Sequence, residues 1–164
     1  MRINTSVITY IMDTILHREQ YILIYRVSHI LIFTSLYAIY NKHYILAADA
    51  ASICFSSILY WHKPDYSWRR YFDMAVAKLG ILLQSILAYN AQYAIPYYCT
   101  TFIALSCYPL GIYYYSKKDY WRSTYAHIGL HIIMNSASII LYSGYITPKI
   151  EPLPTPLIGP HPQE

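Results

Sequence analysis

The sequence is poor in charged residues, and this scarcity excludes several classes of protein. Asp, Glu, Lys and Arg make up 12% of it, against 56% hydrophobic residues, whereas soluble domains carry about 25% charged residues. It has no run of Lys and Arg of the kind that follows a phosphate backbone, so nucleic acid is not an expected partner. The three cysteines lie in apolar stretches without CxxC spacing, which predicts buried thiols and no disulfide framework. No cleavable signal peptide is expected, because the apolar stretch 7–15 is short and contains Asp13.

The sequence is rich, in contrast, in apolar blocks close to the ~20 residues that cross a ~30 Å hydrocarbon core. Five blocks cover residues 21–40, 44–61, 71–89, 93–115 and 123–145. Tyr or Trp flanks most block ends, as interfacial anchors do. We therefore expect an all-α fold: a polytopic membrane helix bundle of about five antiparallel transmembrane helices in contact with the lipid bilayer. A soluble all-α core is the alternative, but these blocks are apolar on every face and long.

The two ends of the chain differ from the blocks, which predicts three regions. Residues 1–20 form a short amphipathic lead, suited to a helix on the membrane surface. Residues 21–145 form the transmembrane domain. Residues 146–164 hold six of the nine prolines and predict an extended tail, either a docking segment or an ordinary terminus.

The basic residues of the predicted loops are distributed unequally, and this predicts an orientation. The side that holds the N-terminus carries eight Lys and Arg: Arg2, Arg18, Lys63, Arg69, Arg70, Lys117, Lys118 and Arg122. The other side carries Lys42 and Lys149. Because cytoplasmic loops are enriched in Lys and Arg, the N-terminus should be cytoplasmic and the C-terminus non-cytoplasmic. The abundance of Ile, Tyr and Asn suits an AT-rich genome, for instance that of a large DNA virus, in which case the membrane would be the host's.

Several ionisable residues fall inside the apolar blocks, where they are costly and usually face the bundle interior. His127 and His131 are four residues apart, so they share one helix face. Since the blocks alternate in direction, the end of the second block and the beginnings of the third and fifth lie on the same side. Ser57, His62 and Asp73 can therefore meet the histidine pair in one layer. Three histidines beside a carboxylate are what a catalytic zinc site needs, and Asp73 could then accept a proton from bound water.

The order Ser, His, Asp and HisxxxHis resembles that of the CREST superfamily of membrane hydrolases, which includes alkaline ceramidases, adiponectin-receptor-like and haemolysin-III-like proteins. The resemblance implies that His62, His127 and His131 hold zinc, that Asp73 holds the metal-bound water and that Ser57 assists the site. It also implies hydrolysis of a lipid amide. That family has seven spans, and this sequence predicts five.

A second account needs no catalysis, and it makes a structural or interaction role in a membrane, with membrane-protein partners, the first functional prediction. In this account Trp61 is an interface anchor and Asp65 or Ser67 caps the following helix. Asp73 pairs with a base such as Lys78 or Arg26, and the two histidines bond to neighbouring helices. A third alternative is a proton or ion path through Asp49, Asp73 and the histidines.

Overall fold

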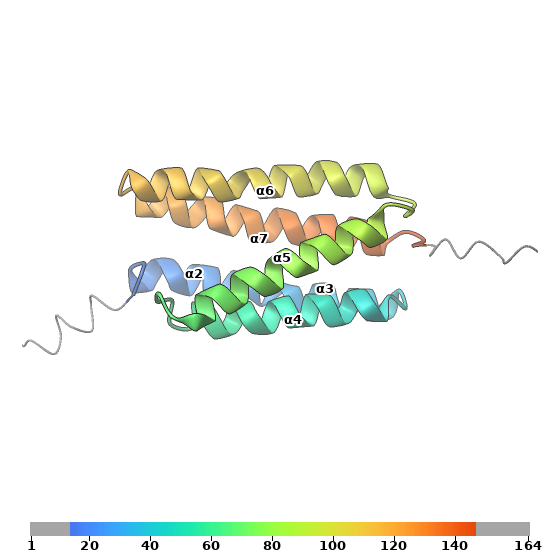
Figure 1. The fold of residues 1–164 in the computed structure, drawn as a ribbon, viewed down its shortest axis with the longest axis horizontal. Helices are drawn as coiled ribbons and strands as arrows, with labels where there is room; N and C mark the ends of the chain where they lie inside the picture. Colours follow the sequence, from blue (N-terminus) through green and yellow to red (C-terminus); the bar gives the residue numbers. More distant parts are fainter. Residues whose placement is uncertain (1–13, 147–164) are drawn as a thin grey trace, which may run out of the picture.

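The computed structural model describes residues 14–146, and this part of the chain is a bundle of helices. The helices are α2 (Arg18–Ser28), α3 (Ile30–Tyr40), α4 (Tyr44–Trp61), α5 (Trp68–Ala88), α6 (Ala94–Ser116) and α7 (Tyr120–Tyr142). α2 and α3 follow one another along one line, so the described chain crosses the bundle five times (Figure 1). The predicted lead up to residue 13 and the predicted tail from residue 147 lie outside the described residues.

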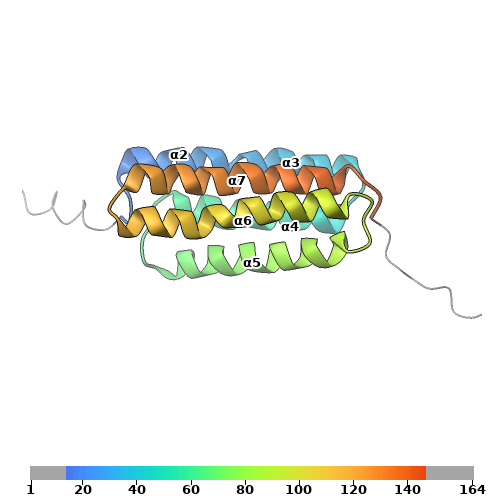
Figure 2. The same ribbon diagram turned by 90° about the horizontal axis from the view of Figure 1, so that it is seen from above.

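The helices are not equally close to one another. α7 packs along α6 and also contacts α2 and α3, while α4 packs against α3 and α5. α5 crosses the bundle obliquely: it starts beside the end of α4 and finishes beside the start of α6 (Figure 1). Seen from above, it lies on the side of the bundle away from α2, α3 and α7 (Figure 2). The tilt brings the end of α5 close to α6 and leaves its start apart from it.

The first predicted span is one rod with a break at His29. Ser28 Oγ donates to the Ile24 carbonyl at 3.0 Å, and His29 Nδ1 lies 2.8 Å from the Tyr25 carbonyl. The backbone N–H of His29 bonds to Arg26 O, a tighter turn than an α-helix makes. Two consecutive side chains that bond to the preceding turn locally replace the regular ladder, which is a known cause of helix bending.

Among residues 14–146, four helical segments are long and apolar enough to cross a membrane: Arg18–Tyr40, Tyr44–Trp61, Trp68–Ala88 and Tyr120–Tyr142. They correspond to four of the five predicted blocks and fit an integral membrane location. The fourth block, which forms α6, has 23 residues but is not among these four segments. Its six tyrosines, together with Pro, Thr and Ser, lower its mean hydropathy.

The bundle carries apolar residues outside and many polar residues inside. Phe33, Phe55, Ile86 and Phe102 are more than 60% exposed. Polar side chains are buried at Ser28, Thr34, Ser35, Ser56, Ser57, Gln84, Thr101, Thr124, Asn135 and Ser138. Exposed apolar surface is what lipid contact requires, and small polar residues between helices are typical of membrane bundles.

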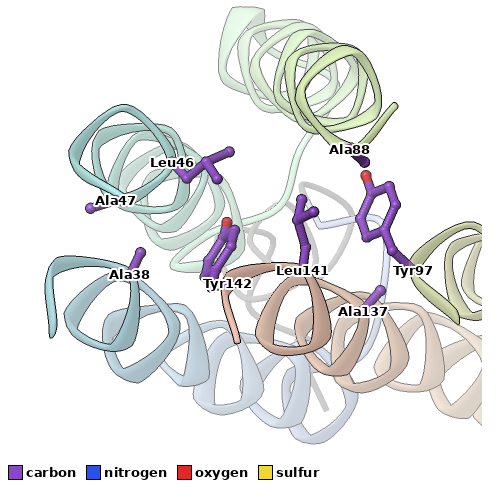
Figure 3. Packing of buried hydrophobic residues seen from close by; sticks show 8 residues of the cluster. All are labelled: Ala38, Leu46, Ala47, Ala88, Tyr97, Ala137, Leu141 and Tyr142. Carbon is purple, nitrogen blue, oxygen red and sulfur yellow. The ribbon is translucent and has the colours of Figure 1, made fainter. Parts of the chain in front are cut away.

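A cluster of small and aromatic residues closes the end of the bundle where α4 and α6 begin. Leu141 and Tyr142 of α7 point into the space between α4 and α5, and Tyr97 of α6 points toward Ala88 of α5 (Figure 3). Tyr97, Ala88 and Tyr142 have no exposed surface. This cluster joins α5 to α6 and α7 at that end of the bundle.

Candidate functional site

A cavity of about 260 Å³ lies between α3, α4, α5, α6 and α7, and its lining follows α5 from Asp73 to Gln84. Its apolar lining includes Leu31, Ile53, Met74, Ala77, Ile81, Leu105, Leu130 and Met134. Its polar lining comprises Ser57, Asp73, Lys78, Gln84, Tyr108, His127, His131, Asn135 and Ser138. A mainly apolar hollow with a few convergent polar groups is the usual form of a small-molecule site.

Asp73, in the second turn of α5, is bound by two hydroxyls of α4. Ser56 Oγ and Ser57 Oγ donate to the same oxygen, Oδ1, at 2.9 and 2.8 Å. Both serines are buried, and their small side chains let the carboxyl group approach α4 closely. A typical intramolecular hydrogen bond contributes about 0.5–1.5 kcal/mol of net stability. Asp73 is thus held in place through one oxygen, and it also lines the cavity.

His127 and His131 face one another on successive turns of α7. Their Nε2 atoms are 3.2 Å apart, so one nitrogen can donate a proton to the other. The Trp61 ring lies 4.7 Å from the His127 ring. Below the pair, Asn135 Nδ2 donates to the His131 carbonyl at 2.7 Å, and Thr34 Oγ1 donates to Asn135 Oδ1 at 2.6 Å. These contacts fix the rotation of α7 about its axis, so that His127 and His131 border the cavity.

A second carboxylate, the half-buried Asp49, is bound by a side chain of α5. Gln84 Nε2 donates to Asp49 Oδ2 at 2.8 Å, and Ser138 Oγ donates to Gln84 Oε1 at 2.9 Å. Gly80 permits this contact, because a Cβ there would lie 2.7 Å from Asp49 Oδ1. The network ties α4, α5 and α7 together, so Asp49 has a structural explanation.

The structure brings four of the five predicted site residues to one cavity: Ser57, Asp73, His127 and His131. His62 is not among them. Its side chain is exposed at the end of α4 and lines another pocket, with its ring 6.2 Å from that of Tyr25. Within residues 14–146, no group of three His, Cys, Asp or Glu side chains is arranged to hold a metal ion.

The ion pairs of the described chain lie in the loops, not in the cavity. Arg69 Nη2 is 2.7 Å from Asp65 Oδ2, and Arg122 Nη1 is 3.3 Å from Asp119 Oδ2. Partial burial acts to raise the pKa of Asp65, but hydrogen bonds from Ser67 and Arg69 outweigh it, so this pKa lies below its ordinary value. In residues 14–146, the bases suggested by the sequence for Asp73 form no ion pair with it, and hydroxyls hold it instead.

The structure confirms one helix cap that the sequence predicted. Sequence reasoning missed three residues that position the site. Ser67 Oγ accepts from the Arg69 N–H at 3.3 Å and caps α5, as predicted. Gln84, Thr34 and the hydroxyl of Ser56 were not singled out for their contacts. Gln84 stands out as a lone amide in an apolar block, which is a usable signal. The hydrogen-bond partners of these three residues can be identified only once it is known which faces of the helices meet.

Comparison with known families, curated proteins and solved structures finds no match to this chain.

Proposed function

We propose that the chain is a multi-pass membrane protein that binds an amphiphilic molecule from the bilayer in the cavity between α4 and α7. The observation that carries this proposal is the gathering of Ser57, Asp73, His127 and His131 at one hollow whose other walls are mainly apolar. The apolar walls suit an acyl or similar chain. The carboxylate and the imidazole pair suit a hydroxyl or amide head, because they offer both an acceptor and a donor.

The tilt of α5 supports entry from the lipid phase. α5 has little contact with α6, and the cavity lies on that side of the bundle. Asp73 and the histidine pair lie toward the end of the bundle where α5 and α7 start, and the loops at that end carry most of the basic residues. We infer that this end faces the cytoplasm, since short loops rich in Lys and Arg stay on that side.

Two substitutions in α5, one on the face that lines the cavity and one on the outer face, test the proposal. Ala77 lines the cavity, whereas Ala75 is exposed on the outside of the same helix. The protein in phosphatidylcholine vesicles is labelled with a photoreactive N-acylsphingosine. Ala77→Phe should fill the cavity and reduce labelling of the α7 peptide about tenfold, and Ala75→Phe should leave it unchanged. Equal labelling of both variants would refute cavity binding.

A second candidate is the lipid-amide hydrolase that the resemblance to the CREST superfamily implies. The observation in its favour is the 3.2 Å separation of the two Nε2 atoms. Imidazole nitrogens are common zinc ligands, so His127 and His131 would be the two residues of α7 that hold the metal. Ser57 and Asp73 border the same cavity. The third ligand does not fit, because His62 lines a different pocket, and we derive no reaction step through the metal.

Zinc content decides between the two candidates. The hydrolase requires about one zinc per purified chain, measured by elemental analysis, and loss of that zinc in a His127→Ala/His131→Ala variant. Zinc that survives in this variant, or substoichiometric zinc in the parent protein, would reject the hydrolase. Neither result affects the amphiphile-binding proposal, which the labelling experiment tests by itself.

A further inference from the structure

The pocket that holds His62 is a separate feature, and its lining is basic. It has a volume of about 420 Å³ and is lined by Arg18, Tyr21, Ile22, Tyr25, Trp61, His62 and Lys63. The first four follow one face of α2, at spacings of three, four and seven residues. Trp61 is the last residue of α4, and His62 and Lys63 follow it. α2 and α4 are in contact, so two helix ends build one hollow.

The chemistry of the lining suits an anion. Arg18 and Lys63 bring two positive charges, His62 adds an imidazole, and the tyrosines add hydroxyl groups that can donate. Among the described residues that line it, none is Asp or Glu. Arg69 Nη2 donates to the Lys63 carbonyl at 2.9 Å and also pairs with Asp65, which fixes the loop backbone at this wall.

The position of the pocket suits a membrane-surface ligand. It lies at the end of α4, a helix long and apolar enough to cross a membrane, and Trp61 forms part of its wall. Trp and Tyr concentrate at headgroup depth. Basic pockets between membrane helices on the cytoplasmic side bind the headgroups of anionic lipids. On its other side Trp61 packs on His127 of the cavity, so the two hollows are neighbours but have different linings.

We propose that this pocket binds a phosphate group that carries net negative charge, supplied by an anionic phospholipid headgroup or by a soluble phosphate. Arg18 and Lys63 neutralise the charge. His62, Tyr21 and Tyr25 surround the phosphate oxygens, and the apolar parts of Ile22 and Trp61 lie against the glycerol side of a lipid. His62 therefore serves anion binding at the surface of the bundle.

The test is equilibrium binding to the full-length chain in dodecyl maltoside micelles at fixed salt. The probe is dioleoyl phosphatidic acid with a fluorescent acyl chain. Arg18→Gln/Lys63→Gln should weaken binding about 30-fold, because each Lys or Arg near an anionic surface contributes about a fivefold factor. The control, Lys117→Gln/Lys118→Gln, removes the same two charges from exposed residues of the same end and outside the pocket. It should change binding less than twofold. Arg18→Gln alone should weaken binding about fivefold. Because Arg18 is exposed, this single variant replaces the double variant in the test if the double variant does not fold.

Competitors distinguish the two sources of phosphate. Displacement of the probe by unlabelled phosphatidic acid, but not by inorganic phosphate, identifies a lipid headgroup; displacement by inorganic phosphate as well identifies a soluble phosphate. Equal losses in the pocket and control variants would overturn the proposal, since they would show attraction to the whole basic end. Displacement by phosphatidylcholine as effective as by phosphatidic acid would also overturn it.

Discussion

Gly80 lies where α5 packs closely against α4, and an added methyl group there would clash. An added Cβ would lie 2.6 Å from Ile53 Cδ1 and 2.7 Å from Asp49 Oδ1. The isoleucine terminus can move, but Asp49 is bound at 2.8 Å by Gln84, which is itself bound by Ser138. The substitution Gly80→Ala must therefore displace Asp49 from Gln84 or separate the two helices.

The expected cost can be assembled from its parts. Ala is better than Gly in a helix by about 1 kcal/mol, which favours the variant. Overpacking costs about 1–3 kcal/mol, and a buried polar group that loses its partner costs about 1–3 kcal/mol more. The net effect is a loss of about 1–5 kcal/mol in the free energy of unfolding, measured by helix content during titration of mixed micelles with SDS.

Gly129 provides the matched control, because it lies in α7 and a Cβ there would meet Cys107 Sγ at 3.6 Å, an ordinary contact. Gly129→Ala should leave stability unchanged or raise it by up to about 1 kcal/mol. If Gly80→Ala is as stable as Gly129→Ala, the inference that α5 packs closely against Asp49 of α4 is refuted. A reduced effect of Gly80→Ala in an Asp49→Ala background would show that the carboxylate is the group displaced.

Two further predictions concern the loops. Because the pKa of Asp65 is lowered in the folded protein, its contribution to stability is present above the ordinary pKa of 3.8 and is lost as the pH falls through the folded value. The difference in unfolding free energy between the parent protein and Asp65→Asn should therefore shrink between pH 7 and pH 3. A constant difference would contradict the loop geometry. A protease site inserted at 117–119 should be cut from the cytoplasmic side and one at 41–43 from the opposite side, and the reverse pattern would overturn the orientation inferred from the basic residues.

Helix positions were predictable from the sequence because apolar blocks and their short connections carry the signal directly. The break at His29 was not, because it depends on which carbonyls Ser28 and His29 reach. The approach of Ser57, Asp73 and the α7 histidines followed from the alternating direction of the helices. His62 did not join them, since direction along the bundle says nothing about the face of α4 on which a residue lies. One residue past Trp61 turns the side chain by about 100°, from the interior to the surface.

The two half-buried carboxylates of α4 and α5 differ in their surroundings. Ionisable residues at membrane depth are costly, so each needs an explanation. Asp49 has one: it joins three helices through Gln84 and Ser138, and Gly80 makes room for it. The two hydroxyl bonds to Asp73 converge on Oδ1, and Asp73 borders the cavity together with the histidine pair. Each carboxylate accepts its hydrogen bonds at one oxygen, but Asp73 lines the cavity and Asp49 does not. Asp73 therefore has acceptor capacity beside an apolar hollow, which is the arrangement expected where a polar head of a ligand is to be received.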